Sequence, residues 1–453
     1  MANKNPDTDP WYVFSTIMGA PEEVDDKSLV SENREFWNRC ILNCLPENER
    51  QRIIYENNIS KNESVIIDNN EIMDLWGKRI KNSELPGNAN PPILNNQLLL
   101  EKIDWKSIAF KRGIFCERYV FPVQVDLQKA KIEGYADFRG SCFLDEAFFI
   151  ESTFYSVADF AYSSMESFAI FDKATFRGPA IFSRIKIGEY CSFSSSSFED
   201  EAAFINSDFP EVADFSKARF SSYVGFNEAR FPGSAEFMSA SFNYTADFST
   251  SVFAIPPTFD GRTIHPDTIW PEEEDQWPSA TNDKEEAKRA ERTWSSLRLA
   301  MNHAQRHNAE MDFFGRELDA RRVHSSFEIR NVILLYKLLS DYGRSVSRPL
   351  YWWLGAWFFA FSANYWLLLG HFPHYTFEHG AAITDFTLGN ALSLGGTYTN
   401  TERRHWLADK VFGSPDTSQI PWLIDFLSLG HSIASLLCIF LIGLALRNRL
   451  RIK

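Results

Sequence analysis

The feature that most constrains this chain is a phenylalanine repeat with a period of eleven residues, which runs from residue 136 to residue 259. Two registers of this period alternate at steps of five and six residues, and Ala or Ser usually stands two positions before each aromatic residue. A fixed period of this kind is typical of a solenoid, in which neighbouring repeats bury a continuous core. The phenylalanines of the two registers are Phe138, Phe143, Phe149, Phe154, Phe160, Phe171, Phe176, Phe182, Phe193, Phe198, Phe204, Phe209, Phe215, Phe220, Phe226, Phe231, Phe237, Phe242, Phe248, Phe253 and Phe259.

The composition of the repeat favours strands over helices. A period of eleven also fits a right-handed helical supercoil, but Phe, Ser, Thr and Asp are only moderate helix formers. In a strand, a small residue two positions before a phenylalanine points to the same face. We therefore expect short extended segments with Phe and Ala or Ser turned inward, separated by polar turns. The phenylalanines are predicted to be core residues and not a ligand site.

The repeated segments ADFRGSCF, ADFSKARF and AEFMSASF resemble pentapeptide-repeat proteins of the Phe-rich type with alternating spacing. The resemblance implies a right-handed quadrilateral β-helix in which two eleven-residue units make one coil. At one strand spacing per coil, six coils would form a rod of roughly 30 Å. Leu127 and Ile132 extend the register upstream, with Phe121 and Cys116 as further candidates. The pattern departs from the repeat at Met165, Ile187, Cys191 and Pro257.

The flanking sequences suggest four further parts. Residues 1–115 are predicted to be a mixed or helical domain that caps the β-helix of residues 116–260, the alternative being a partner-binding head. Residues 261–282, which are rich in Pro and acidic side chains, are predicted to be a linker. Residues 283–345 are predicted to be cytoplasmic helices, and residues 346–453 a transmembrane region.

The predicted helix at 283–322 carries an apolar stripe with heptad-like spacing. Two interpretations stay open for it. The helix packs on the end of the β-helix, or it forms a self-associating coil and makes the chain a homo-oligomer, with Asn308 as a polar residue that sets the register.

Two apolar runs, at about 351–369 and 423–446, are long enough to span a membrane as a two-helix hairpin. Basic residues flank their outer ends, which predicts a multi-pass protein with both termini in the cytoplasm. The start of the chain lacks a long apolar segment, so we expect no cleavable signal peptide. The alternative is a buried helical hairpin in a soluble protein. The segments YGRSVSR, FFGRELDARR and FLIGLALRNRLRIK are similar to membrane-anchored pentapeptide-repeat proteins of bacteria, which implies the inner membrane.

The connection between the two runs holds a short apolar segment at 383–399 that is a candidate re-entrant turn. Asn390, Gly395, Gly396 and Thr397 are its candidate turn or pore residues. The order of elements resembles the two-helix pore domain of cation channels, although the potassium filter sequence is missing. The alternative is an interfacial helix or an outer loop. Asp425, near the start of the second run, is either an interfacial carboxylate or a group on a polar pathway.

The remaining sequence features argue against catalysis and metal binding. The chain carries no P-loop, G-x-S-x-G or H-E-x-x-H motif. Its six cysteines contain no C-x-x-C pair, which indicates a reducing compartment without disulfides. We therefore expect no enzyme activity, no cofactor and no metal site. Residues 136–259 hold 8 Lys and Arg against 17 Asp and Glu, a net charge of −9, which disfavours direct binding of nucleic acid.

Three functions fit these observations. The first is a membrane-tethered, non-enzymatic scaffold that presents an acidic cytoplasmic β-helix to a protein partner. The second is an oligomeric two-helix pore with the β-helix as its sensor. The third is a nucleic-acid mimic, because the resemblance implies it: some pentapeptide-repeat proteins mimic nucleic acid and act on DNA-binding proteins such as gyrase, and the net charge of −9 is compatible with this.

Overall fold

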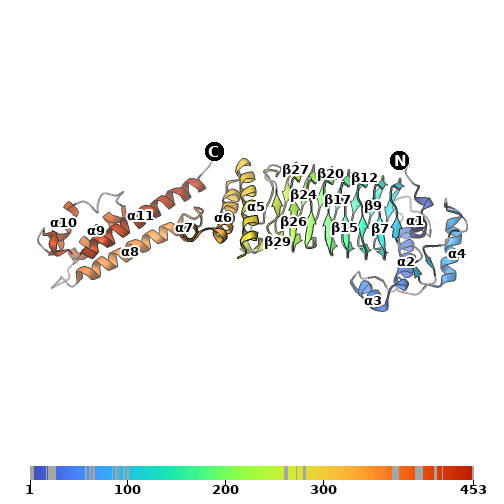
Figure 1. Cartoon of the computed structure of the whole chain (residues 1–453), viewed down its shortest axis with the longest axis horizontal. Helices are drawn as coiled ribbons and strands as arrows, with labels where there is room; N and C mark the ends of the chain where they lie inside the picture. Colours follow the sequence, from blue (N-terminus) through green and yellow to red (C-terminus); the bar gives the residue numbers. More distant parts are fainter. Residues whose placement is uncertain are drawn as a thin grey trace. The chain divides into compact units, whose positions relative to one another are not determined.

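The computed structural model of the chain describes residues 5–16, 18, 27–56, 59–60, 63, 67–83, 85–86, 89, 91–94, 97–98, 102–259, 264–271, 273–278, 282–369, 377–392, 401–412, 416–420 and 422–450 (Figure 1). They belong to two compact units. The first contains residues 1–280 and 292–309, and the second contains residues 281–291 and 310–453.

The first unit opens with short helices around an aromatic core. These elements are η1 (Pro6–Thr8), α1 (Pro10–Ser15), α2 (Lys27–Cys44), α3 (Glu47–Glu56), α4 (Asn69–Ile80) and the antiparallel pair β1 (Ile93–Leu94) and β2 (Gln97–Leu98). Trp11, Phe14 and Trp37 are at most 1% exposed. Trp37 Nε1 donates to the carbonyl of Val120 at 2.6 Å, and the Trp37 ring stacks on Tyr119 at 5.4 Å. Helix α2 therefore covers the start of the solenoid.

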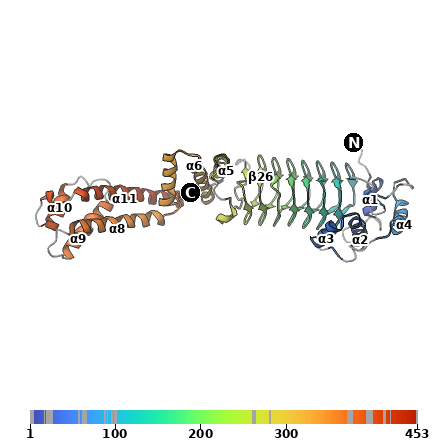
Figure 2. The same ribbon diagram turned by 60° about the horizontal axis from the view of Figure 1, so that its bottom comes forward.

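The rest of the first unit is a parallel β-solenoid of about seven turns (Figures 1 and 2). Each strand pairs in parallel with the strand 22 residues further along the chain, as Phe154 pairs with Phe176. Its eight-stranded sheet contains β3 (Lys102–Asp104), β7 (Gln124–Asp126), β11 (Ala147–Phe148), β15 (Phe168–Ile170), β19 (Tyr190–Ser192), β22 (Val212–Asp214), β26 (Ser234–Phe237) and β30 (Thr258–Phe259).

Further sheets complete each turn. One seven-stranded sheet contains β4 (Ala109–Phe110), β8 (Lys131–Ile132), β12 (Thr153–Phe154), β16 (Thr175–Phe176), β20 (Ser197–Phe198), β23 (Arg219–Phe220) and β27 (Ser241–Phe242). The other contains β5 (Gly113–Phe115), β9 (Tyr135–Asp137), β13 (Ala158–Asp159), β17 (Ala180–Ile181), β21 (Ala202–Ala203), β24 (Val224–Gly225) and β28 (Ala246–Asp247). A four-stranded sheet contains β6 (Val120–Phe121), β10 (Cys142–Phe143), β14 (Ser164–Met165) and β18 (Lys186–Ile187), and a two-stranded sheet contains β25 (Arg230–Phe231) and β29 (Val252–Phe253). Asp208 bridges the last two sheets by pairing with Lys186 and Arg230.

The phenylalanine repeat fills the interior of this solenoid, so the predicted Phe-rich solenoid is confirmed. Every phenylalanine of the two registers is at most 4% exposed. Rings one turn apart lie almost parallel, as Phe160 and Phe182 do at 5.0 Å and 2°, and rings half a turn apart meet edge to face, as Phe171 and Phe182 do at 5.3 Å and 85°. Both arrangements are favourable for aromatic pairs.

The solenoid is longer at both ends than the repeat predicts. It begins at Lys102, upstream of the boundary at residue 116, because Ile103, Ile108 and Ile114 occupy the inward positions without the Phe signature. Past residue 260, Trp270 stands 22 residues after Phe248 and stacks on it at 5.3 Å. Part of the predicted linker at 261–282 is therefore the end of the ladder.

A left-handed residue recurs every eleven positions at the corners, a feature that the repeat does not predict. These residues have φ between 55° and 62° and include Ser107, Arg118, Lys129, Gly140, Glu151, Tyr162, Lys173, Arg184, Ser195, Asn206, Lys217, Glu228, Ser239 and Thr250. Most are not Gly, although this conformation costs other residues roughly 1 kcal/mol. The backbone bonds between turns hold them in it, as when Lys173 N donates to the carbonyl of Ser194 at 2.9 Å.

The helices that follow are α5 (Lys284–His303), α6 (His307–His324), α7 (Phe327–Ser340), α8 (Ser347–Leu369), α9 (Phe377–Leu392), α10 (Thr401–Phe412) and α11 (Trp422–Arg449), with the short turns η2 (Glu274–Gln276) and η3 (Thr417–Gln419). The predicted continuous helix at 283–322 is wrong, because Gln305, with φ 58°, ends α5 and separates it from α6. Trp294 of α5 packs edge-on against Trp277 at 5.3 Å, and Trp277 stacks on Phe253. Helix α5 therefore packs on the end of the solenoid, which is one of the two interpretations of the apolar stripe at 283–322.

One helix among the described residues, α11, is long and apolar enough to cross a membrane. Helix α8, which covers the other predicted span, lies beside α11 in both ribbon views (Figures 1 and 2). It carries no charge from Tyr351 to Leu369, but its Trp and Tyr side chains and Asn364 lower its mean hydropathy. A single candidate span is therefore shown where two are predicted.

Candidate functional site

The outward side of the eight-stranded sheet carries large apolar side chains. Since Ala147, Ala169, Cys191 and Ala213 point inward, their neighbours along β11, β15, β19 and β22 point outward. We call these outward residues the aromatic face: Phe148, Phe168, Ile170, Tyr190 and Val212.

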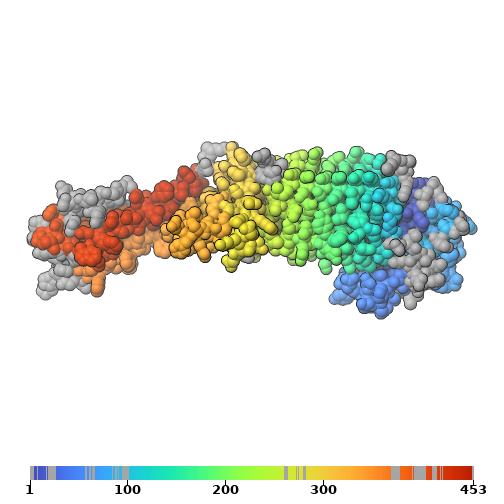
Figure 3. All heavy atoms as spheres, in the orientation of Figure 1, coloured from blue at the N-terminus to red at the C-terminus, as the bar shows by residue number. Residues whose placement is uncertain are grey.

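The aromatic face follows neighbouring strands of the sheet; Phe168 is its exposed member, and the other four residues are half-buried. Phe168 is 37% exposed, and its ring meets that of Tyr190 at 6.1 Å in an edge-on arrangement. Phe148 pairs with Ile170 in the strand ladder, and Phe168 pairs with Tyr190. In the space-filling view, the cyan to green surface of the solenoid has no deep hollow on the side that is drawn (Figure 3). These apolar side chains are not needed to fill the interior of the solenoid, which the phenylalanine ladder already fills.

Carboxylates line one edge of the aromatic face. Glu189 and Glu211 immediately precede Tyr190 and Val212, and Glu166 stands two positions before Phe168. Glu189 and Glu211 are exposed. We call Glu146, Glu166, Glu189 and Glu211 the acidic edge.

The acidic edge already binds one cation of the same chain. Arg52 of α3 donates to Glu166 Oε2 at 2.8 Å, and both residues belong to the first unit. The next carboxylates along the edge, Glu189 and Glu211, are exposed beside the apolar side chains. A partner that offers apolar side chains flanked by Lys or Arg would match this surface in both polarity and charge.

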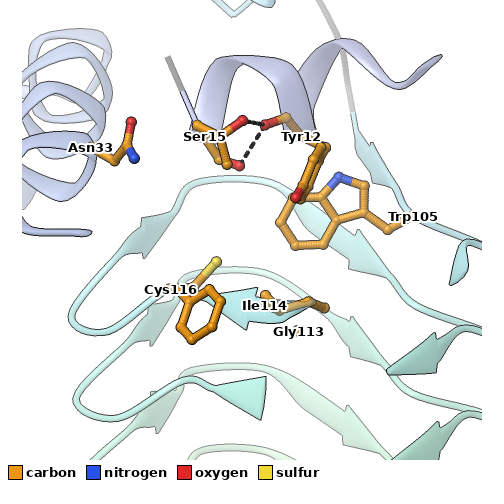
Figure 4. Close-up of a pocket in the computed structure, with 9 residues that line it drawn as sticks. Tyr12, Ser15, Asn33, Trp105, Gly113, Ile114 and Cys116 are labelled. Atoms are coloured by element: carbon orange, nitrogen blue, oxygen red, sulfur yellow. Dashed lines mark hydrogen bonds between the residues drawn. The ribbon is translucent and has the colours of Figure 1, made fainter. Parts of the chain in front are cut away.

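A small cavity between α1 and the start of the solenoid is a packing junction. It has a volume of about 10 Å³, which is room for about one water molecule. Tyr12, Trp105 and Cys116 line it, and Ser15 Oγ donates to the carbonyl of Tyr12 at 2.8 Å (Figure 4). Burial raises the pKa of Tyr12 to about 12 and raises the pKa of the Cys116 thiol, so both groups stay protonated at neutral pH. This chemistry suits a core and not a substrate site.

The residues predicted for a re-entrant turn are only partly within the described structure. Asn390 belongs to α9, so the first part of the segment 383–399 is helical. Gly395, Gly396 and Thr397 lie outside the described residues. Asp425 lies in the first turn of α11 and is half-buried. A carboxylate is stabilised there by the positive end of the helix dipole.

The sequence analysis did not predict a row of buried polar side chains between α8 and α11. Ser428, His431 and Ser435 of α11 and Asn364 of α8 are at most 5% exposed. Asn364 Nδ2 donates to Thr387 Oγ1 at 3.3 Å. Among the described residues, no hydrogen-bond partner is found for Asn364 Oδ1, for either ring nitrogen of His431, or for the hydroxyl groups of Ser428 and Ser435. We call these four residues the polar seam.

The register of the two helices places the members of the polar seam at matching levels. Leu368 and Ile424 share one apolar cluster. At the other end of the two helices, Asn448 Nδ2 donates to the carbonyl of Gly343 at 3.3 Å. The helices are therefore antiparallel, and Asn364 lies at about the level of Ser428. The sequence signal that could have revealed the seam is the spacing of three and four residues between Ser428, His431 and Ser435 inside an apolar helix.

Within the described part of the chain, no group of His, Cys, Asp and Glu side chains has the geometry to hold a metal ion. Comparison of this chain with protein-family models, with curated proteins and with solved structures found no match.

Proposed function

We propose that this protein is a membrane-tethered, non-enzymatic scaffold whose acidic solenoid binds a protein partner. In this proposal the solenoid is a right-handed quadrilateral β-helix of the pentapeptide-repeat type, with two eleven-residue units in each turn. The observation that carries the proposal is the aromatic face, because its apolar side chains point away from a core that the phenylalanine ladder already fills.

The partner we propose is a protein segment with apolar side chains and flanking Lys or Arg residues. The contact between Arg52 and Glu166 supports this, since it is an example of a cation seated on the acidic edge. Exposed ion pairs are worth less than about 1 kcal/mol each. The apolar contacts would therefore supply most of the affinity, and the carboxylates would select for basic partners and speed association.

The tether we propose is a hairpin of α8 and α11 in the inner membrane, with both termini in the cytoplasm. Two observations support it. The side chains of Phe358, Phe359 and Trp366 on α8 are 65%, 67% and 74% exposed, which is costly in water and favourable in lipid. Arg447 and Arg449 lie in the last turn of α11, as expected for a helix end on the cytoplasmic side.

Site-specific photo-crosslinking in the full chain tests the scaffold. A photoreactive residue at Phe168 should trap one discrete partner, and the same residue at Ser197, which points outward from β20 on another sheet, should not. The double charge reversal of Glu189→Lys and Glu211→Lys should reduce the yield of the product at position 168, because it repels a basic partner. Equal products at positions 168 and 197 would refute the aromatic face as the binding surface, and a yield that the charge reversal leaves unchanged would refute the role of the acidic edge.

A second test concerns the tether. The full chain should stay with the membrane after alkaline extraction, and a chain that ends before residue 347 should be released. Release of the full chain by alkali would contradict the hairpin.

A pore is the second candidate function, and the polar seam is the observation that favours it. Unpartnered polar groups are rare inside membranes and commonly mark ion or proton pathways. Two helices cannot enclose a pore, so this function requires several copies. Purified protein in planar bilayers should then show unitary currents that His431→Leu alters and Ile433→Leu, on the exposed side of α11, does not. Silence with every ion tried would exclude it.

A further inference from the structure

Helix α7 exposes a broad apolar surface. Ile333 and Ser340 are buried on one side of the helix, where Tyr336 packs beside them. The opposite side carries Phe327, Val332, Leu334, Leu335 and Leu338, which we call the outer face of α7. At 100° per residue these five side chains fall within about 160° of the helix circumference. Their exposures are 79%, 67%, 38%, 50% and 53% in that order.

The outer face is fixed in place by a turn of uncommon geometry. Asp341, Tyr342 and Gly343 follow α7 with φ of 51°, 57° and 78°, three left-handed residues in succession. Tyr342 is fully buried and its hydroxyl donates to Asp319 Oδ1 at 2.6 Å. Asn448 at the end of α11 bonds to the carbonyl of Gly343. Such strained turns persist only where the surroundings hold them, so α7 is held at the end of the hairpin where α8 begins and α11 ends.

Three basic side chains at the same end are paired with carboxylates. Lys337 and Arg344 are paired with Asp319 and with Asp312 and Asp341. Arg348 contacts Asp341 at 3.5 Å and keeps half of its side chain exposed.

The remaining arginines are available to anions. Arg330, Arg447 and Arg449 are exposed, and none of them forms an ion pair within the described residues; Arg447 Nη2 contacts the amide oxygen of Asn448 at 3.5 Å. Glu328, at the start of α7, is the acidic group on the outer face. The surface around α7 therefore combines apolar side chains with a net excess of cations.

We propose that α7 lies in the membrane–water interface, with its outer face inserted among the lipids and with Arg330, Arg447 and Arg449 bound to anionic headgroups. Helices with a wide apolar face and basic residues at its border bind membrane surfaces in this way. The inference rests on the proposed function, in which α8 and α11 span the same membrane. Trp352 of α8, which is 53% exposed, donates from Nε1 to the carbonyl of Leu338 at 3.3 Å, so the exposed apolar side of α7 continues onto α8. This continuity favours lipid over a second copy of the chain as the occupant.

The test is the environment of a nitroxide label in the full chain, reconstituted in nanodiscs with phosphatidylglycerol. Single labels would be placed at Leu335→Cys, at Phe358→Cys on α8 and at Lys284→Cys on α5. Val332→Cys replaces Leu335→Cys if that variant fails to fold. Burial raises the pKa of the thiols of Cys40, Cys116 and Cys191, which slows their labelling, and the parent chain gives the background.

We expect the Leu335 label to match the Phe358 label, with high accessibility to oxygen and low accessibility to an aqueous nickel complex. The Lys284 label should show the reverse. If Phe358 is in lipid and Leu335 matches Lys284, the inference fails and the proposed tether stands. If Leu335 is shielded from both reagents, a second copy or a protein covers α7 and the inference fails. If Phe358 itself matches Lys284, the tether fails and the inference with it.

A second arm tests the headgroup. The triple variant Arg330→Gln, Arg447→Gln, Arg449→Gln should raise nickel accessibility at Leu335 by at least twofold in phosphatidylglycerol and leave it unchanged in phosphatidylcholine. Basic side chains are attracted to an anionic bilayer and not to a neutral one, so the effect of removing three of them should appear in phosphatidylglycerol alone. Equal values in both lipids, with and without the arginines, would overturn the assignment of anionic headgroups.

Discussion

Phe149 and Phe171 lie one above the other in the solenoid, with ring centroids 4.5 Å apart and ring planes 1° from parallel. The two residues are 22 positions apart, which is one full turn of the chain. The same relationship recurs at Phe171 and Phe193, at 4.7 Å and 6°. Each ring therefore contacts the turn before and the turn after it, so a change at one level weakens two interfaces at once.

A first prediction concerns the centre of this ladder. Phe182 is stacked between Phe160 and Phe204, at 5.0 Å from each, and is fully buried. Phe182→Ala should lower the free energy of unfolding by about 3–5 kcal/mol, because it leaves a cavity between two turns. The measurement is urea denaturation followed by circular dichroism.

The matched control is Phe168→Ala, on the aromatic face. This phenylalanine points outward, so its truncation should change the free energy of unfolding by less than about 1 kcal/mol. Equal destabilisation by the two variants would show that Phe168 belongs to the core.

A second prediction concerns the left-handed corners. Ser195 has φ 59°, a conformation that β-branched residues avoid. Ser195→Val should destabilise the solenoid by about 1–2 kcal/mol, and Ser195→Gly should stabilise it by about 0.5–1 kcal/mol. Ser197→Val, two positions further in strand β20, is the control and should be neutral or slightly stabilising. If Ser195→Val and Ser197→Val change the free energy of unfolding equally, the left-handed conformation at the corner does not restrict the residue type.

A third prediction concerns the cap on the first turn. Asn38 is fully buried, accepts from the backbone N–H of Val120 at 3.0 Å, and donates to the carbonyl of Arg118 at 2.9 Å and to Glu63 at 2.7 Å. Asn38→Ala leaves these groups unpaired and should cost about 2–3 kcal/mol. The loss of stability would be measured as the fall in melting temperature of the full chain.

The control for the cap is another asparagine of α2. Asn43 Nδ2 is buried, and no partner for it is found in the described structure. Asn43→Leu should therefore be close to neutral in thermal unfolding. A loss of stability as large as that of Asn38→Ala would indicate that any change in α2 disturbs the cap.

A fourth prediction concerns pH. Burial raises the pKa of Asp9 from 3.8 to about 6, although Tyr12 N and Trp105 Nε1 donate to it. The folded chain therefore binds this proton more tightly than the unfolded chain does. The contribution of protonated Asp9 to the stability of the folded chain is complete below about pH 4 and is lost as the pH rises through 6.

Asp9→Asn should remove this dependence, because Asn keeps the cap of α1 without a titrating group. We expect the melting temperature of the parent chain, measured relative to that of the variant, to fall between pH 4.5 and pH 7. The corresponding free-energy difference should be on the order of 1 kcal/mol. If the melting temperatures of the two chains change with pH in the same way across this range, the raised pKa of Asp9 is contradicted.

The period of the phenylalanines was sufficient to predict the solenoid, its strands and its inward rings, because strand alternation and stacking depend on spacing along the chain. The same pattern could not locate the ends of the ladder. Ile103 and Trp270 continue the core with other residue types, and only packing against neighbouring turns identifies them as part of it.

The candidate sites depended on the tertiary structure to a larger degree. Phe168 lies outside both registers of the repeat, and strand alternation turns it outward beside the inward Ala169, but only the pairing of β15 with β19 places it against Tyr190 in one face. His431 and Asn364 lie 67 positions apart and are buried between the same two helices only because α8 and α11 pack antiparallel. The sequence by itself determined the local period and thus the solenoid. Which side chains face solvent, which polar groups are buried together and where α7 exposes its apolar side were decided by contacts between distant segments, which no local pattern records.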